Sequence, residues 1–400
     1  MRKILTLAVA VAALFGIVAA SSSASGTHAS AAAKSKPKTC KATIAIMAPI
    51  TGPAAQLGQE QLHFAQFAVA HFNKLLGIHV KYSQNDTQLA TATGLAKVTQ
   101  DAQSIIGNSA NVAVVGPAGS QEVQTAGPLF GRAHIGFVSG SATRTTLTTT
   151  GANPTFMRVV APDAVQGPQD ARYIIKHLHP KAVLLIDDQE AYSQGLVSSM
   201  TPVLQAAGIK VNHQSYNGTD TGATLNNDLS ALVTSQLNSS ETVTILPWQT
   251  AINAQQFGTI AARQGKHTTL FGTDGTDVPA QFNIAGSYVS NFGPDISTSK
   301  NMIDHAIVKG VAKYGPYGSF GVPTYEAAHV VMKAISNVCK AGKTPTRSNV
   351  LAQMRKTYIA ANQNAFGVPL RFNHGGDIIG GGFYLFHVNG SGKYIQIPAK

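Results

Sequence analysis

Two short turns rich in small polar residues carry the side chains with the clearest capacity for chemistry in this sequence. The run GPAGS (116–120) follows one apolar β-branched segment, 111–115, and SGSAT (139–143) follows another, 134–138. Hydroxyls and free backbone N–H groups in such turns can hold an anionic group, above all where a turn leads into a helix. The same residues are also common N-caps of ordinary βα loops, so this stretch alone leaves both interpretations open.

The elements that position these turns can be read from the residues around them. Residues 121–132, between the turns, are long enough for a helix, so the stretch 111–148 is typical of a βαβ unit in a parallel sheet. Ligands of such sheets bind outside the carboxyl ends of the strands. Both turns are therefore expected at one edge of the sheet.

The rest of the chain repeats this pattern, which predicts an α/β protein with two similar halves. In the first half we expect strands at 42–47, 80–82, 111–115 and 134–138, and helices at 60–76, 89–106 and 121–132. In the second half we expect strands at 182–186, 210–213, 242–246 and 268–271, with helices at 195–207, 223–237 and 254–264. Helices at 303–314, 324–341 and 347–360 and a hairpin at 382–397 follow.

The N-terminal segment is typical of an exported protein. Arg2 and Lys3 precede an apolar run, 4–20, and small residues follow it, including Ala29-Ser30-Ala31, which has the form of a cleavage site. A membrane anchor is the alternative, but the small-residue tail favours a cleaved signal in 1–33. No cysteine closely follows the run, which argues against lipid modification, and 34–40 is typical of a linker.

Charge and motifs exclude several classes of function. The net charge of +12 includes five basic residues before residue 39, where there are no acids, so the remainder carries 12 − 5 = +7. Its basic residues are scattered, which does not favour a nucleic-acid partner. The sequence has no nucleophile elbow, Walker loop, H-E-x-x-H motif or cysteine pair at zinc spacing, so we expect neither an enzyme nor a cofactor or metal.

The two cysteines, Cys40 and Cys339, form an even pair in a chain expected to be exported, which suggests a disulfide. Such a bridge would tie the start of the first strand to a late helix. The alternative is two unrelated thiols.

An ordered set of motifs resembles the substrate-binding proteins of branched-chain amino-acid ABC importers. No single motif is highly specific, but the set extends in order over nearly all of 41–395. It comprises TGPAAQLG (51–58), FAQFAVAHFN (64–73), DTQ (86–88), GPAGS, SGSAT, MRVVAPDAVQGP (157–168), YSQGL (192–196), FGTDG (271–275) and GVPLRFNHGGD (367–377).

The resemblance implies a type I periplasmic-binding fold, in which two doubly wound parallel-sheet lobes are joined by three crossovers. We place the crossovers near Val160, Phe292 and Gly367. Lobe one is then 41–160 plus 293–366, and lobe two is 161–292 plus 367–400. Cys40 and Cys339 fall in the same lobe under this division.

The resemblance also implies a site for a free amino acid, which needs partners for both of its charges. Ser120, Ser141, Ala142 and Thr143 match family positions that contact the ligand backbone, with Ser120 on the carboxylate and the Ser141 carbonyl and Thr143 on the ammonium. Asp274 matches the carboxylate of the second lobe that pairs with the ammonium. Its alternative role is that of a turn residue before a glycine.

Three further positions would surround the ligand side chain. Tyr192 matches an aromatic residue that lines the cleft. Trp248 falls where the family often has an aromatic residue, and ordinary core filling is its alternative. Leu57 stands where related proteins often carry tyrosine. Arg144 departs from the family pattern, and it either pairs with a ligand carboxylate or points to solvent.

The function implied is that of an extracytoplasmic solute-binding protein, monomeric and without chemistry of its own. It would capture an amino acid, branched-chain or otherwise apolar, and deliver it to the membrane subunits of an ABC permease. Two alternatives keep the same fold: a ligand-sensing receptor domain, and a carrier for an amide or an aromatic acid. A secreted hydrolase on a similar scaffold would need a nucleophile–base pair that is not found.

Overall fold

A computed structural model describes residues 40–398 of the chain, except 298 and 300. The predicted signal in 1–33 and almost all of the predicted linker in 34–40 lie outside these described residues. Within the described part, no helix is long and apolar enough to span a bilayer.

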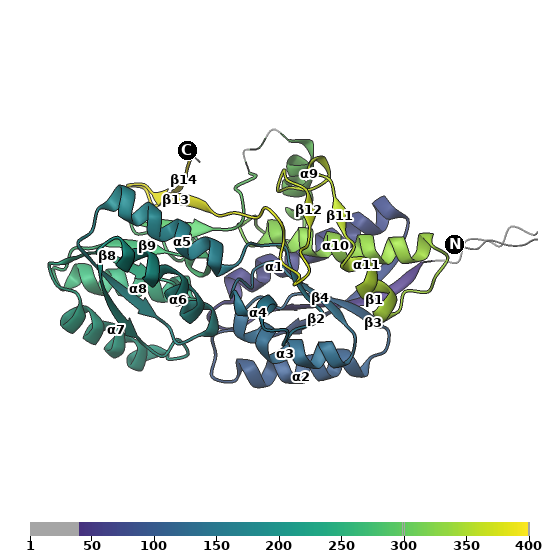
Figure 1. The fold of residues 1–400 in the computed structure, drawn as a ribbon, viewed down its shortest axis with the longest axis horizontal. Coiled ribbons are helices and arrows are strands. Elements are labelled where there is room, and N and C mark those ends of the chain that lie inside the picture. Colours follow the sequence, from purple (N-terminus) through teal and green to yellow (C-terminus); the bar gives the residue numbers. More distant parts are fainter. Residues whose placement is uncertain (1–39, 298, 300, 399–400) are drawn as a thin grey trace, which may run out of the picture. The chain divides into compact units, whose positions relative to one another are not determined.

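The first sheet has five strands, all parallel, in the order β2-β1-β3-β4-β5 (Figure 1). The order reverses between β1 and β3, and this switch point is where ligands bind in doubly wound sheets. The strands are β1 (Lys41–Ala48), β2 (His79–Asp86), β3 (Asn111–Val115), β4 (Gly136–Ser139) and β5 (Phe156–Arg158), and the helices between them are α1 (Ala55–Leu76), α2 (Gly94–Gly107), α3 (Ser120–Arg132) and α4 (Thr146–Thr149).

The second sheet repeats this order in its parallel part, β7-β6-β8-β9-β10, and adds the antiparallel strands β13 and β14 at one edge. Its strands are β6 (Ala182–Asp187), β7 (Lys210–Ser215), β8 (Glu241–Leu246), β9 (Thr269–Gly272), β10 (Tyr288–Asn291), β13 (Tyr384–Val388) and β14 (Tyr394–Ile397). Its helices are α5 (Asp163–Tyr173), continued by a π-helical turn η1 (Ile174–Leu178), α6 (Ala191–Ala206), α7 (Gly222–Gln236), α8 (Ala251–Arg263) and the 3₁₀ turn η2 (Asp274–Thr276).

After β10 the chain returns to the first sheet. The helix α10 (Gly321–Lys340) packs along α1 and contacts β3 and β4, and its buried side chains share one apolar cluster with those of β1. The remaining elements of this part are α9 (Met302–Val311), α11 (Arg347–Met354), the 3₁₀ turn η3 (Ala361–Gln363) and a two-stranded sheet of β11 (Tyr358–Ile359) and β12 (Leu370–Arg371).

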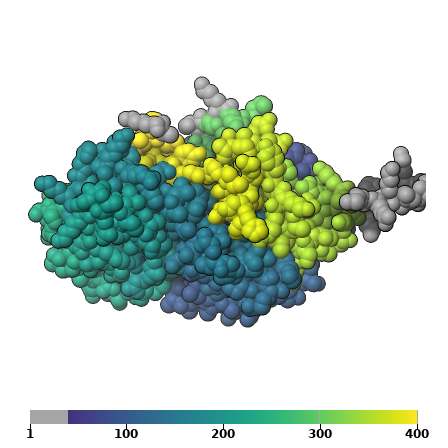
Figure 2. Space-filling view, viewed as in Figure 1, coloured from purple at the N-terminus to yellow at the C-terminus, as the bar shows by residue number. Residues whose placement is uncertain are grey.

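The third passage between the sheets falls later in the chain than the expected Gly367. Leu370 and Ile378 still pack in the apolar cluster of the first sheet, whereas Phe383 packs in that of the second. The passage is therefore at 380–382, three consecutive glycines. The C-terminal segment can be followed from β12 to β13 in the yellow part of Figures 1 and 2.

Local departures from the predicted elements have identifiable causes. His134 has a φ of 52°, in the left-handed region, so β4 begins only at Gly136. The predicted helix 347–360 ends at Met354, because Tyr358 and Ile359 pair instead with Arg371 and Leu370. The predicted C-terminal hairpin is present.

A disulfide joins Cys40 to Cys339, across 299 positions of sequence. Cys40 directly precedes β1, and Cys339 lies in the last turn of α10. The bridge therefore fastens the start of the first sheet to the helix that covers it.

Replacing both cysteines with serine is expected to lower the free energy of unfolding by about 2–5 kcal/mol, because the open chain gains conformational freedom when unfolded. Urea denaturation of the oxidised protein and the double variant measures the difference. Reduced wild-type protein should then match the variant. An unchanged midpoint in both would contradict a stabilising role.

Candidate functional site

The predicted site residues follow the carboxyl ends of strands in both sheets, next to the two switch points. Ser120 and the loop 140–145 follow β3 and β4 of the first sheet. Tyr192, Trp248 and Asp274 follow β6, β8 and β9 of the second. The predicted ligand-binding residues of both sheets are at most 7% exposed, and residues of the two sheets contact one another here. They are Leu57, Ser120, Ser141, Ala142, Thr143, Tyr192, Trp248 and Asp274.

Ser120 is the first residue of α3, and its hydroxyl is oriented by the neighbouring loop. Its Oγ accepts a hydrogen bond from the backbone N–H of Arg144 at 3.2 Å. The Ser120 hydroxyl proton is therefore free to be donated, and the N–H groups of the first turn of α3 have no acceptor within the helix. The Ser120 hydroxyl and these N–H groups can together donate hydrogen bonds to a carboxylate.

The side chain of Ser141 is engaged in hydrogen bonds within the protein. Its hydroxyl donates to the carbonyl of Ala118 and accepts from the amide of Gln61, both at 2.8 Å. The Ser139 hydroxyl accepts from the backbone N–H groups of Ser141 and Ala142. These bonds fix the two loops against each other. Because the hydroxyl is occupied, the backbone carbonyl of Ser141 is the group expected to contact a ligand.

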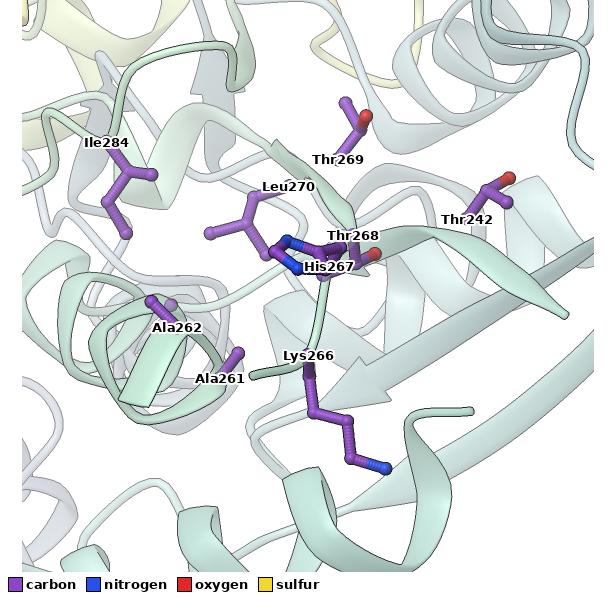
Figure 3. A pocket seen from close by; sticks show the side chains of 10 residues that line it. Thr242, Ala261, Ala262, Lys266, His267, Thr268, Thr269, Leu270 and Ile284 are labelled. Atoms are coloured by element: carbon purple, nitrogen blue, oxygen red, sulfur yellow. The ribbon is translucent and has the colours of Figure 1, made fainter. Parts of the chain in front are cut away.

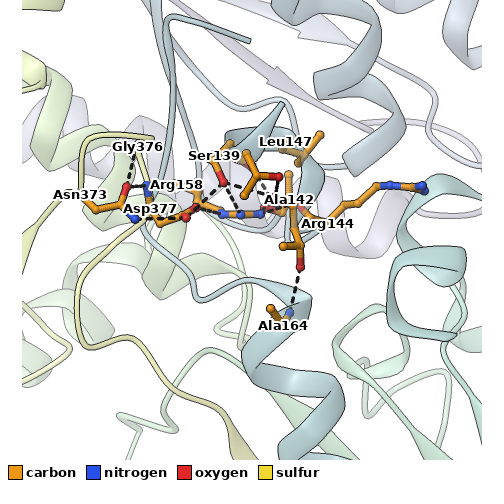
Figure 4. Close-up of polar contacts among 12 residues, drawn as sticks. Ser139, Ala142, Arg144, Leu147, Arg158, Ala164, Asn373, Gly376 and Asp377 are labelled. Atoms are coloured by element: carbon orange, nitrogen blue, oxygen red, sulfur yellow. Dashed lines mark hydrogen bonds and ion pairs between the residues drawn. The ribbon is translucent and has the colours of Figure 1, made fainter. Parts of the chain in front are cut away.

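A buried arginine supports the same loop from behind (Figure 4). The Arg158 guanidinium donates to the carbonyls of Ala142 and Arg144 at 3.2 and 2.8 Å, and to the Thr148 hydroxyl at 3.0 Å. Its Nε is 2.7 Å from the carboxylate of Asp377. Because Arg158 is 0% exposed, this ion pair and its hydrogen bonds replace the water that the guanidinium would otherwise need.

On the second sheet, Tyr192 and Asp274 form one hydrogen-bonded unit. The Tyr192 hydroxyl lies 2.8 Å from Oδ1 of Asp274 and 2.6 Å from the Thr273 hydroxyl. The N–H of Gly275 donates to the Tyr192 oxygen at 3.0 Å. A Cβ at Gly275 would lie 2.1 Å from the carbonyl oxygen of Trp248, so this turn requires glycine.

Asp274 is a buried carboxylate without a protein cation. Burial raises its pKa to about 8, an effect opposed by hydrogen bonds from Tyr192 and Gln166 and increased by the charge of Asp163. Over the residues that the structure describes, no lysine, arginine or histidine forms an ion pair with it. The ionised form of Asp274 therefore lacks a counter-charge, which a ligand ammonium can supply.

Asp163 connects the Ser141–Thr143 loop to the Asp274 side of the site. Its N–H donates to the Thr143 carbonyl at 2.8 Å. Burial raises the pKa of Asp163 to about 7, while the Thr143 hydroxyl and the charges of Arg158 and Arg144 lower it. Asp163 thus already has cations nearby, whereas Asp274 does not.

Arg144 does not point to solvent, as one sequence interpretation had it. Its backbone belongs to the loop after β4, but its guanidinium donates to the carbonyl of Ala191, the first residue of α6, and to the Thr146 hydroxyl. The side chain therefore links the ligand loop of the first sheet to a helix of the second.

The apolar part of the site contains groups from both sheets. Leu57 and Ala118 share one buried cluster with Trp248 and Tyr216, whose rings meet edge to face at 4.6 Å. The indole N–H of Trp248 donates to the carbonyl of Ile186 at 2.6 Å, which fixes the ring. Trp248 also packs on Phe257, so it fills the core, and its contact with a ligand stays a prediction.

Sequence reasoning missed several polar side chains that form hydrogen bonds around the candidate site residues. Gln61 lies in the expected helix 60–76, Ser139 in the SGSAT motif, and Gln166 in the motif 157–168, but none of the three was singled out as a site residue. Gln166 donates to the Ser290 hydroxyl at 3.0 Å, which in turn bonds to Asp170 at 2.6 Å. Partners so far apart in sequence leave no local signal.

Several cavities of the structure lie away from these residues. One of about 440 Å³ is lined by Thr242, Thr269 and neighbouring groups (Figure 3). These residues begin β8 and β9, so the cavity is at the edge opposite Asp274.

Among the described residues, no cluster of three or more histidine, cysteine, aspartate or glutamate side chains could hold a metal ion.

Comparison with known proteins gives one consistent result. A family model described as periplasmic binding protein matches residues 41–393. The Leu/Ile/Val-binding protein of Citrobacter freundii is 25% identical over 366 residues, covering 87% of this chain and 91% of that protein.

Two solved structures share the fold. The leucine-binding protein of Thermotoga maritima superposes with a TM-score of 0.76 at 18% identity, covering 89% of this chain and 98% of that one. A branched-chain amino acid transporter substrate-binding protein of Streptococcus pneumoniae, in complex with isoleucine, gives 0.73 at 19% identity, covering 89% and 100%.

Proposed function

This chain belongs to the periplasmic binding protein family, and from that premise we propose that it captures an amino acid with an apolar side chain and delivers it to an ABC permease. It binds its ligand without catalysing a reaction. Relatives named for leucine, isoleucine and valine binding support this choice of ligand. Export, release from the membrane after signal cleavage, and a monomeric state belong to the same proposal.

The single observation that carries the proposal is the state of Asp274. It is buried, its pKa is raised to about 8, and its hydrogen-bond partner Tyr192 is neutral. A carboxylate in this position costs free energy unless a cation joins it. The α-ammonium of an amino acid is such a cation.

The other ends of the ligand have matching partners. The ligand carboxylate binds the Ser120 hydroxyl and the first turn of α3, while the Ser141 carbonyl and Thr143 accept the remaining ammonium protons. The apolar side chain then packs among Leu57, Trp248 and their cluster. Because these groups belong to two sheets, binding requires the sheets to approach each other, which is hinge closure.

The motifs implied lobes of 41–160 with 293–366 and 161–292 with 367–400, and the proposed hinge lies between two such lobes. The packing of Leu370 and Ile378 favours moving the last boundary to about residue 380. Ligand binding shifts the population toward the closed form, which the permease recognises.

Thermal unfolding in the presence of amino acids tests the ligand. Leucine, isoleucine or valine should raise the melting temperature, because a ligand that binds only the folded state stabilises it. Glutamine and benzoate represent the amide and aromatic-acid alternatives, and lysine serves as a charged control. If no apolar amino acid shifts the transition at millimolar concentration, the proposed ligand class is wrong.

Replacing Arg144 with alanine is expected to weaken binding roughly fivefold, about 1 kcal/mol, mainly through faster dissociation. The variant loses the hydrogen bond from Arg144 to the Ala191 carbonyl, which exists only while the two sheets are close. Stopped-flow dissociation kinetics measure the effect. Arg132→Ala, an exposed arginine on α3, is the matched control, and equal rates in all three proteins would contradict the prediction.

A further inference from the structure

A second concave site lies on the side of the first sheet that α1, α9 and α10 cover. Its volume is about 510 Å³, within the range of small-molecule sites. The part of α1 that lines it, from His71 to Leu76, is the carboxyl end of that helix, whereas Leu57 of the amino-acid site lies in its first turn. The two sites are therefore separate.

One wall of this pocket is apolar and partly open to water. Leu75 and Met302 line it and are 64% and 87% exposed, so together they present apolar surface beside the pocket. Behind them Phe72 stacks on His329 at a ring distance of 4.2 Å. The wall thus offers an aliphatic rim and an aromatic floor.

A second part of the lining is a stripe of hydrogen-bond donors on α10. Lys333, Ser336, Asn337 and Lys340 are spaced to lie on one face of the helix, and all line the pocket. Burial and the charge of Lys340 lower the pKa of Lys333, so each lysine would gain from a nearby anion.

The described part of the chain supplies no anion to this stripe. No aspartate or glutamate is among the residues that line the pocket, and neither lysine forms an ion pair with a described residue. Ser336 is 1% exposed, and its Oγ has no hydrogen-bond partner among the described groups. A buried hydroxyl without a partner is costly, which indicates that a polar group of a ligand belongs there.

The two histidines of the pocket are already engaged. His71 Nδ1 lies 2.9 Å from the Tyr325 hydroxyl, and His329 Nδ1 lies 3.0 Å from the buried Glu326. Glu326 Oε2 thus contacts His329 while its Oε1 accepts from the N–H of Ala365, and neither oxygen forms an ion pair with a lysine among the described residues. The pocket therefore combines apolar residues with two lysines that form no ion pair with any residue the structure describes.

We propose that this pocket binds a small carboxylate with an apolar chain or ring, its carboxylate between Lys333 and Ser336 and its apolar part against Phe72, Leu75 and Met302. Charge complementarity selects an anion, and the apolar wall selects against small hydrophilic anions. The site does not depend on the amino-acid function proposed above.

Octanoate is a suitable probe, with octanol and butyrate as controls that lack the charge or most of the chain. Titration calorimetry on the mature protein should give octanoate binding in the micromolar to low-millimolar range and weaker binding of both controls. Binding should persist when leucine is present at saturation. Displacement of octanoate by leucine would place it in the amino-acid site and overturn the proposal.

The double variant Lys333→Gln/Lys340→Gln should weaken octanoate binding at least about fivefold. Ala306→Trp, which fills the pocket, should abolish it. Lys309→Gln on α9 removes the same charge from an exposed position outside the pocket and should have no effect. Thermal unfolding confirms that each variant is folded. Equal octanoate affinity in wild type and the double variant overturns the proposal. So does the absence of binding at about 5 mM octanoate, a concentration at which low-millimolar affinities are detected.

Discussion

Replacing Asp274 with alanine is expected to weaken amino-acid binding at least about tenfold, ~1.4 kcal/mol. Losing one partner of a buried charge pair commonly costs about 2–5 kcal/mol, so the loss can be considerably larger. Calorimetric titration with leucine or another ligand found by thermal unfolding measures it. An unchanged affinity would remove Asp274 from the site.

Asp274→Asn is the matched variant, because it keeps the shape and the hydrogen bond to Tyr192 and removes only the charge. It should lose affinity almost as much as Asp274→Ala. The free energy of unfolding of the ligand-free variant at pH 7 should not fall, because an amide does not have to take up a proton on folding, as the carboxyl group of Asp274 does at this pH. Weaker binding in a stable protein separates a ligand contact from a folding defect.

The pH dependence of binding gives a second test of Asp274. Its pKa of about 8 in the folded protein exceeds the ordinary value, so the folded state binds the proton more tightly than the unfolded state. The contribution of Asp274 to the free energy of unfolding is therefore fully present below about pH 4 and is lost as the pH rises to about 8. The ligand ammonium requires the ionised form, so affinity should increase from pH 6 to pH 8.

Other acids near Asp274 must be separated from this effect. Asp163 and Asp170 also have pKa values raised by burial, and the charge of each interacts with that of Asp274 or of nearby arginines. Asp274→Asn should remove most of the increase in affinity with pH. An increase that persists in the variant would assign the titration to Asp163 or Asp170.

Replacing Arg158 with methionine is expected to lower the free energy of unfolding by about 3–5 kcal/mol, because Asp377 then loses its cation and the carbonyls of Ala142 and Arg144 lose their donor. Urea denaturation measures the change. Arg158→Lys should recover little, since an ammonium cannot replace the planar guanidinium at several acceptors.

Exposed Arg132 provides the control, and Arg132→Met should change stability by no more than about 0.5 kcal/mol. If Arg158→Met is equally mild, the buried pair does not stabilise the fold. If Arg158→Met is stable but binds the amino acid poorly, the role of Arg158 is to position the Ser141–Thr143 loop and not to stabilise the fold.

The sheet order follows from features that the sequence displays. Apolar β-branched runs such as 111–115 and 182–186 alternate with helical stretches, and this alternation predicts parallel sheets with short right-handed connections. The pairing of β11 with β12 could not be predicted in this way. Tyr358 and Ile359 have no periodic neighbours, and their partners lie beyond an irregular segment.

The placement of the candidate site residues was predictable as far as it depends on loops that follow strands. Ser120 and Asp274 occupy such positions, and the structure places both among buried groups. The roles of Arg144 and Gln61 depend on partners 47 and 80 positions away, Ala191 and Ser141. Only the packing of the folded chain brings these pairs together.

The position of Trp248 gives this protein a built-in optical reporter. It is the single tryptophan of the chain, and its ring packs in a cluster that draws side chains from both sheets. Separation of the sheets would hydrate the indole, and emission from an indole shifts to longer wavelength in water. If ligand capture closes the sheets as proposed, intrinsic fluorescence should therefore report ligand occupancy without any attached dye.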